Sequence, residues 1–426
     1  MGGVRSIAVV AGAIALMLLP APATGANTTD RACAWVLEPT YDRENILFPE
    51  VTTRYLGAIV PAPPGGYVEI SGEYPHARYM SLQTYSSTLQ TTSVLRDTAI
   101  EPDKGSRNPF VRGADRRSGK RSYTVRLVSG RQPASPAPNT LYNTSADGKL
   151  SGNGLAYRIY LADDNSGRFG GVAPPDLALV TANGTRIPIP SCPDIVPDTS
   201  GLSDAFTEVG LDGVPLPPVG VLGKRNPVFH RYVNAPTSYG LIATENELFP
   251  DALERAVAGV TLLLPAGLGE NADNKYVAAY LSQEFGKIAV VSAKMPNTPK
   301  TLAGQKRMGG GQMRFWSMCT GFLATQTHDC ATDENVAVDK HDRFQIVMST
   351  NQSRPADATD KCGFTWLSWG PSPKHIAIMR NMLPAKRFKH AVQDAKLDHE
   401  QETMGAYYPH VRYFATPEAF EQKYGC

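Results

Sequence analysis

The stretch Arg78-Tyr-Met-Ser-Leu-Gln-Thr84 alternates apolar and polar side chains, which is the pattern of a half-buried β-strand. A second stretch, Arg314-Phe-Trp-Ser-Met-Cys-Thr320, repeats the arginine, the serine and the threonine at the same positions. The two stretches therefore indicate that one set of strands occurs twice in the chain. The alternative is that any two β-rich segments share apolar alternation.

Four further pairs of segments match in the same order along the chain. They are Tyr55–Val60 with Tyr276–Leu281, Gly66–Ile70 with Gly286–Val290, Tyr123–Val128 with Phe344–Ser349, and Tyr157–Leu161 with Met379–Leu383. The spacing agrees as well, because the same number of positions separates Tyr55 from Pro75 and Tyr276 from Pro296. Strand composition does not easily produce matches in one order, so we interpret the sequence as a duplicated unit.

Glycine and proline are frequent, with 38 and 34 residues spread along a chain of 426. They separate short runs rich in Val, Ile, Tyr and Thr, which is typical of all-β sandwiches and barrels. Each unit needs two facing sheets to bury its inward side chains. We therefore expect a mainly β protein built from two tandem jelly-roll-like β-sandwiches, with a short helical insertion and a helical C-terminal tail.

The composition also predicts where these parts begin and end. We place the first sandwich at residues 33–190, a Pro/Gly-rich connector at 191–265, the second sandwich at 266–384 and a mainly helical tail at 385–426. Apolar residues recur at helical spacing in Glu245–Val257 and in Phe388–Leu397. Thr416-Pro-Glu-Ala419 has the residues of a capped helix start, with proline at the first helical position.

The N-terminus has the layout of a secretory signal peptide at residues 1–26. Arg5 precedes an apolar run at Ile7–Leu19, and small residues follow, so we expect cleavage near Ala23 or Ala26. The apolar run is shorter than the roughly 20 residues that span a bilayer, which disfavours the alternative of a membrane anchor. We expect a secreted protein with no transmembrane segment after cleavage.

Six cysteines remain after that cleavage, and an even number in an exported chain predicts three disulfides. They are Cys33, Cys192, Cys319, Cys330, Cys362 and Cys426. Cys319 and Cys330 are the closest in sequence and could link neighbouring strands. Pairing Cys362 with Cys426 would hold the C-terminus, and pairing Cys33 with Cys192 would close the first unit. The sequence alone leaves the pairing open.

Charge is balanced, with 42 basic and 40 acidic residues. No large basic field is present to bind nucleic acid or an anionic membrane. The single basic cluster, Asp115-Arg-Arg-Ser-Gly-Lys-Arg121, contains Gly and Ser and is interpreted as a solvated loop. We therefore expect no nucleic-acid partner, and the partner or ligand of the protein stays open.

Part of the second half resembles a known family. The stretches that carry this resemblance are Gly311–Ser317, Arg343–Val347, Phe364–Pro371 and Ile376–Pro384. They are similar to the bacterial domain of unknown function twelve-fourteen, although Thr365 stands where that family has asparagine and Met382 where it has tyrosine. The whole chain resembles uncharacterised exported proteins of actinobacterial type. The resemblance implies tandem jelly-roll-like sandwiches and brings no established activity or catalytic residues.

The repeated arginines are the first candidate site residues. Arg78 and Arg314 open equivalent strands, and Arg158 and Arg380 end equivalent ones. A guanidinium at the mouth of a sandwich binds a carboxylate through two parallel hydrogen bonds. The alternative is an internal salt bridge, for example to Asp97 or Glu101 in the first unit.

His76 is the second candidate, as an acid/base group or ligand contact beside Arg78, with an ordinary surface histidine as the alternative. The chain has no G-x-S-x-G, HxH, HExxH or CxxC motif, so we predict no metal or other cofactor. Asp163–Gly167 has alternating oxygen ligands but fits an ordinary turn better than a calcium loop.

Two functions remain open from the sequence. One is a secreted protein for binding or surface interaction through its tandem sandwiches. The other is a secreted enzyme that acts on a small, anionic substrate at the cleft between the two units. An enzyme predicts a deep cleft where His, Asp or Glu and Arg converge, whereas a binding protein predicts a shallow aromatic or edge-strand surface.

Overall fold

The computed structural model describes residues 34–43, 45, 48–87, 89–191, 225–232, 269–321 and 326–426. It is mainly β, as the sequence predicts, with four sheets and two short α-helices near the C-terminus of the described chain. The expected signal peptide, most of the connector, Cys33, Cys192 and the helix expected at Glu245–Val257 lie outside the described residues. No helix among the described residues is long and apolar enough to cross a membrane.

The first unit consists of two sheets that share one core. One sheet has the order β1 (Thr53–Ile59), β7 (Gly154–Ala162), β3 (Ala77–Tyr85) and β4 (Thr91–Arg96); the other has β6 (Thr140–Thr144), β5 (Ser122–Arg131), β2 (Tyr67–Glu73), β8 (Asp176–Val180) and β9 (Arg186–Ile189). Leu82 and Ile159 from the first sheet lie in the same buried cluster as Val68 and Val125 from the second. Apolar alternation therefore produces the sandwich expected for each unit.

The second unit repeats this arrangement. One sheet has the order β10 (His230–Tyr232), β11 (Asn274–Ser282), β17 (Lys374–Met382), β13 (Phe315–Gly321) and β14 (Thr327–Thr332); the other has β16 (Thr365–Ser368), β15 (Arg343–Ser349), β12 (Ile288–Lys294) and β18 (His410–Phe414). Its core joins Met318 and Met379 to Val291, Phe344 and Trp369. Strand β10 comes from the predicted connector and adds an edge to the first of these sheets.

Strand pairing confirms that the two arginine stretches are equivalent. Ser81 of β3 pairs with Arg158 of β7, and Ser317 of β13 pairs with Arg380 of β17. On the other side of each arginine strand, Arg158 faces Tyr55 and Arg380 faces Tyr276, as the predicted match of those tyrosines requires. Parallel pairing also recurs, between β5 and β6 and between β15 and β16. The jelly-roll description stays a prediction.

One of the five matches is displaced by a residue. Val68 pairs with Leu127 and points into the core, whereas its predicted counterpart Ile288 points to the opposite side of β12. Ala289, the next residue, pairs with Met348 and occupies the core position. Side chains alternate between the two faces of a strand, so a match that is wrong by one residue exchanges the faces.

The C-terminal tail is less helical than the sequence predicts. Its strand β18 pairs with β12 and completes a sheet of the second unit. Phe388–Leu397 contains only a 3-10 turn at Val392–Asp394, followed by a five-residue helix α5 at Glu400–Met404. The apolar side chains of that stretch are buried against the sandwich, so their spacing reflects packing without a helix.

The tail ends with the helix that the sequence predicts. Thr416 accepts a hydrogen bond from the Ala419 amide over 3.3 Å, and Pro417 opens α6 (Pro417–Tyr424). After this helix, Cys426 forms a disulfide with Cys362, which is another of the pairings that the sequence left open.

The other described disulfide links neighbouring strands, which is one of the pairings that the sequence left open. Cys319 and Cys330 are direct partners in the pairing of β13 with β14 and form the bond. For the third expected pair, the described neighbours are close, because the Ala34 amide donates to the Pro190 carbonyl over 2.9 Å. Both observations agree with an oxidising compartment.

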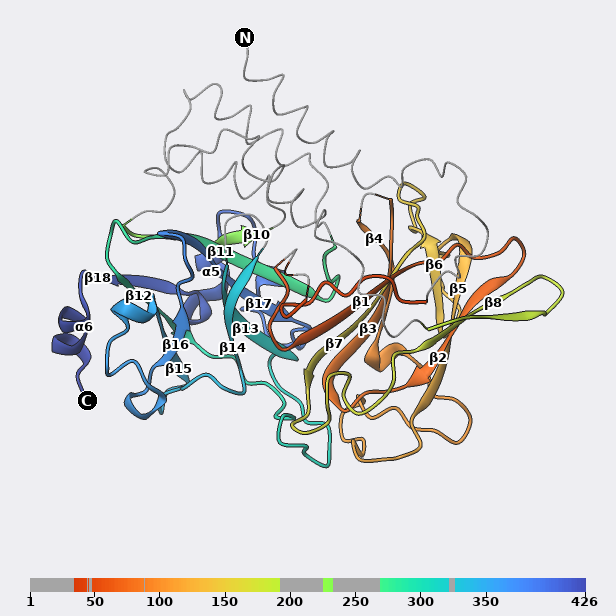
Figure 1. Ribbon diagram of the computed structural model, residues 1–426, viewed down its shortest axis with the longest axis horizontal. Helices are drawn as coiled ribbons and strands as arrows, with labels where there is room; N and C mark the ends of the chain where they lie inside the picture. Colours follow the sequence, from red (N-terminus) through yellow and green to blue (C-terminus); the bar gives the residue numbers. More distant parts are fainter. Residues whose placement is uncertain are drawn as a thin grey trace, which may run out of the picture.

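The two sandwiches lie side by side, with the first unit's orange and yellow strands on the right of Figure 1 and the second unit's blue strands on the left. Aromatic and apolar side chains fill the contact between them, around Tyr79 and Tyr160 of the first unit and Phe315 and Met382 of the second. The ring centroids of Tyr160 and Phe315 are 5.4 Å apart. We call this contact zone the seam.

Candidate functional site

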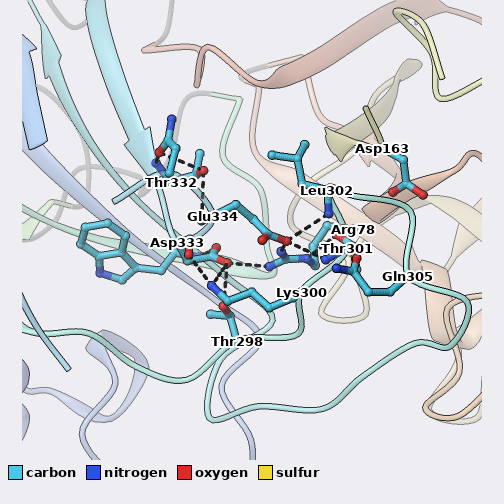
Figure 2. Close-up of polar contacts among 12 residues, drawn as sticks. Arg78, Asp163, Thr298, Lys300, Thr301, Leu302, Gln305, Thr332, Asp333 and Glu334 are labelled. Carbon is cyan, nitrogen blue, oxygen red and sulfur yellow. Dashed lines mark hydrogen bonds and ion pairs between the residues drawn. The ribbon is translucent and has the colours of Figure 1, made fainter. Parts of the chain in front are cut away.

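Arg78 lies at the seam and is fully buried. Its Nη1 donates to Asp333 over 2.9 Å, its Nη2 donates to Glu334, and its Nε donates to the Thr301 hydroxyl over 2.7 Å. Figure 2 shows the guanidinium held among these groups, all of which belong to the second unit. Protein acceptors therefore engage every nitrogen of the guanidinium, which leaves it no free edge for a ligand.

The two acids that bind Arg78 are themselves fixed by further donors, as the dashed lines of Figure 2 show. Asp333 accepts from the Thr298 hydroxyl over 2.6 Å, and Glu334 accepts from the Thr301 and Leu302 amides over 2.6 and 3.1 Å. Burial opposes the charged form of Glu334, but these amides and Arg78 outweigh burial and lower its pKa. Residues 298–302 are thereby tied to the start of the loop after β14.

Arg314 forms the counterpart of this ion pair. Its Nη2 donates to Asp97 of the first unit over 3.0 Å and to the Phe110 carbonyl over 3.3 Å. Asp97 follows β4, just as Asp333 follows β14, so the two units exchange equivalent ion pairs across the seam. Burial raises the pKa of Asp97 to about 6, against the opposing effect of Arg314.

The structure thus places Arg78 and Arg314 in the internal salt bridges that the sequence left as the alternative to a ligand site. The pairs run between the units, whereas the sequence suggested partners within the first unit. Asp97 does bind an arginine, but that arginine is Arg314. The two residues hold the seam together, and we no longer assign them to ligand binding.

His76 is partly buried and lies beside Arg121, whose Nη1 is 2.9 Å from the Nδ1 of the imidazole. Burial lowers the pKa of His76, and Arg121 and Arg116 lower it further, so the ring is neutral at pH 7. It does not line the groove described below. The structure therefore gives His76 a packing role beside a buried arginine.

The basic loop at 115–121 is not the solvated loop that the sequence predicts. Arg116 and Arg121 are only 2% and 4% exposed. Arg116 binds the Asp163 carboxylate and donates to the Gln305 carbonyl of the second unit over 3.0 Å. Arginine has five donors in a planar fork, so backbone carbonyls from both units can satisfy it inside the seam.

A groove of about 450 Å³ opens where the two units meet. It is lined by Thr52, Arg54, Ile159, Leu161, Ala162, Gly167, Arg168 and Leu302. Most of its wall belongs to the ends of β1 and β7 and to the turn at 163–168, whereas Leu302 comes from the second unit. The groove thus combines an apolar wall with two arginine side chains, which is the usual make-up of a small-molecule site.

Acidic side chains hold these two arginines in place. Arg54 donates to Asp42 over 3.1 Å, and Arg168 binds Glu38, which also lies 3.8 Å from Arg43. The side chains of Arg54 and Arg168 remain 23% and 29% exposed, so both still face solvent. Arg43, Arg54 and Arg168 thus share the two carboxylates of Glu38 and Asp42.

The two acids differ in how easily they are neutralised. Burial raises the pKa of Glu38, and Arg168 and Arg43 only partly offset it. Burial also acts on Asp42, but Arg54 and a hydrogen bond from Thr40 outweigh it and lower the pKa of Asp42. Mild acid therefore releases Arg168 from its counter-charge before it releases Arg54.

The sequence did not single out the residues of this groove. Arg54, Arg168 and Leu302 come from three distant segments, and no motif connects them. The matches between the two units did single out Tyr55–Val60 and Tyr157–Leu161, which the structure pairs as β1 and β7 beside this groove.

Potential metal ligands gather in three places among the described residues. Two of the groups consist of a carboxylate and a disulfide, namely Glu50 with Cys319 and Cys330, and Asp357 with Cys362 and Cys426. In the third, His230 lies 3.2 Å from Asp398, and Glu400 accepts from the Arg231 amide over 2.7 Å. Bonded sulfurs and hydrogen-bonded acids account for these contacts, so we assign no metal to them.

Comparisons with known proteins identify the fold without a function. No family model matches the sequence, and no curated protein matches it. An uncharacterised protein from Burkholderia cenocepacia has a similar structure, with a TM-score of 0.50 and 12% identity over 97% of this chain and 96% of that chain. A Vibrio parahaemolyticus protein has a TM-score of 0.37 and 14% identity over 85% and 89%. The resemblance to the domain of unknown function twelve-fourteen stays a prediction.

Proposed function

We propose that this chain is a secreted binding protein whose groove at the seam holds a small organic carboxylate. The observation that carries the proposal is the groove itself, where Arg54 and Arg168 stand at the edge of an apolar wall. A carboxylate accepts charge-assisted hydrogen bonds from guanidinium groups, and the side chains of Arg54 and Arg168 are each partly exposed, with the Nε and Nη2 atoms of Arg168 buried.

The apolar wall of the groove determines the chemical character of the rest of the ligand. Leu161, Ala162 and Leu302 present methyl and methylene groups to the groove. Burying such surface favours a ligand with an apolar body by roughly 25 cal/mol per Å². The volume of the groove fits a molecule with a few carbon atoms more readily than a polymer, and a ligand there touches both units at once.

Binding is favoured over catalysis by where the titratable groups lie. An enzyme in this cleft predicts a histidine or a carboxylate facing the ligand together with arginine. The described residues that line the groove offer arginine and threonine, while His76 packs against Arg121 elsewhere. The acids Glu38 and Asp42 are engaged as counter-charges to the two arginines.

Export is part of the same proposal. Two disulfides among the described residues support an oxidising compartment, and the N-terminal sequence supports a signal peptide removed near Ala23 or Ala26. N-terminal sequencing of the protein recovered from the culture medium of an expressing bacterium tests this. A protein that stays inside the cell with its N-terminus intact would contradict it.

Calorimetric titration of the mature protein tests the binding site. Phenylacetate and phenylacetamide have the same shape and differ in charge, so we expect only the acid to bind. Changing Arg168→Gln removes a charge-assisted hydrogen bond of roughly 1.5–3 kcal/mol, which weakens binding by about 10-fold or more. Arg186→Gln is the matched control, because Arg186 is an exposed arginine paired with Glu69 away from the groove.

Equal affinity for the acid and the amide would contradict the proposal, as would equal losses in Arg168→Gln and Arg186→Gln. Leu302→Ala supplies a second test from the other unit. It should weaken binding of phenylacetate by shortening the apolar wall while leaving the preference for the acid unchanged.

A further inference from the structure

The carboxylates that bind the two groove arginines belong to one short segment of the described chain. Glu38 binds Arg168, and Asp42 accepts from Arg54 over 3.1 Å and lies 4.0 Å from Arg168. Both arginines line the groove, whereas neither acid does. We call residues 38–42 the acidic strap, because this segment supplies counter-charges to both arginines from beside the groove.

The backbone fixes the acidic strap next to β1. Leu37 and Gly57 of β1 exchange backbone hydrogen bonds of 3.1 and 2.8 Å. A Cβ atom at position 57 would lie only 3.0 Å from the Cβ of Leu37, so glycine permits this close approach. Glu38 follows Leu37 directly, and its carbonyl accepts from the Thr40 amide over 2.7 Å. The main chain therefore keeps Glu38 within reach of Arg168.

The Glu38 carboxylate is held less firmly than the acids at the seam. Its buried Oε1 accepts no hydrogen bond from the described residues besides its ion pair with Arg168. Glu334, in contrast, accepts from the Thr301 and Leu302 amides in addition to its own ion pair. The side chains of Glu38 and Arg168 are 18% and 29% exposed, and a partly exposed ion pair contributes little to stability. Glu38 can therefore leave Arg168 at low cost.

A ligand carboxylate needs the same guanidinium that Glu38 occupies. The Nη2 of Arg168 is buried where Glu38 binds it, so a ligand reaches this donor only after Glu38 has moved away. A site whose binding-competent state is only partly populated has its apparent affinity reduced by that fraction. The ion pair between Glu38 and Arg168 therefore lowers the affinity of the groove for an acid.

We propose that Glu38 is an internal competitor for the ligand, which occupies Arg168 in the free protein and leaves it when an acid binds in the groove. This inference rests on the proposed function, since it concerns the same groove. Glu38 thereby sets the affinity of the site and excludes acids that bind Arg168 more weakly than its own carboxylate does.

Protonation of Glu38 ends the competition, so mild acid should strengthen binding. Burial raises the pKa of Glu38 above its usual 4.5, against the charges of Arg168, Arg43 and Arg54, and the charge of Asp42 adds to the rise. The pKa of Asp42 itself is lowered, so Asp42 keeps its contact with Arg54 over the same pH range. The ligand stays charged as well, because simple carboxylic acids titrate near about pH 4.

Calorimetric titration of the mature protein with phenylacetate at pH 7 and at pH 5 tests the proposal. The affinity of the unchanged protein should rise as the pH falls. Glu38→Gln should bind roughly 2- to 5-fold more tightly than the unchanged protein at pH 7, as expected for the loss of a partly exposed ion pair, and should respond little to pH. Glu69→Gln is the matched control, because Glu69 binds Arg186 away from the groove.

His76 requires a second control, because its amide donates to the Gly170 carbonyl over 2.8 Å, two residues after Arg168. His76→Asn should keep the dependence of affinity on pH. Equal affinities of the unchanged protein and Glu38→Gln at pH 7, or a pH dependence that Glu38→Gln keeps or His76→Asn loses, would overturn the competition by Glu38 and leave the proposed function intact. Failure of phenylacetate to bind either protein would overturn the proposed function, and this inference with it.

Discussion

Replacing Arg78 by methionine should destabilise the folded protein by about 3–4 kcal/mol. The change removes a fully buried guanidinium and leaves Asp333 and Glu334 without their principal counter-charge. Breaking a buried pair on one side typically costs about 3–5 kcal/mol. We expect the lower part of that range, because Thr298 and the Thr301 and Leu302 amides still donate to the two acids and methionine fills part of the space.

Urea unfolding of the mature, disulfide-intact protein measures this change. The double variant Arg78→Met with Asp333→Asn removes the charges of Arg78 and Asp333. It should recover about half of the stability lost in Arg78→Met, since no unpaired aspartate remains buried. The control is Arg186→Met, which breaks an exposed pair with Glu69 and should change stability by about 0.5 kcal/mol or less. A loss below about 1 kcal/mol in Arg78→Met, or no recovery in the double variant, would refute the reasoning.

Two further predictions concern Asp97 and the third disulfide. Burial raises the pKa of Asp97 from 3.8 to about 6, so the stability it contributes falls as pH rises between those values, by about 3 kcal/mol. The free energy of unfolding of Asp97→Asn, measured in urea, should therefore rise relative to that of the unchanged protein by up to this amount from pH 4 to pH 7. A difference in unfolding free energy that does not change with pH would argue against this. Peptide mapping without reduction should recover Cys33 joined to Cys192, because Ala34 and Pro190 are hydrogen-bonded neighbours; reduced cysteines there would contradict the pairing.

The equivalence of the two units could be predicted, because the same residue types follow one another in the same order along single strands of both units. Arg78 and Arg314 precede the same pattern of serine and threonine, and the two strands occupy equivalent places in their sheets. The one-residue error at Gly66–Ile70 has a physical origin too. The two segments were aligned on the glycine at the start of each strand. The correct alignment is instead set by which side chains of each strand face the core.

What the arginines bind could not be predicted from the sequence. Arg78 and Asp333 are 255 positions apart in the sequence. Nothing in the sequence distinguishes Asp333 from the other acidic residues as the partner of Arg78. The burial of the basic loop could not be predicted for a related reason, since its Arg116 is covered by carbonyl groups of the second unit. The groove depends on three distant segments that meet only once the seam has formed.

A crystal structure of the mature protein grown with phenylacetate tests the groove at the seam most directly. The two-unit arrangement and the groove predict electron density for the acid between Arg54 and Arg168, with its ring against Leu302. Density for the acid at some other place, or a seam in which Arg78 does not reach Asp333, would contradict the account.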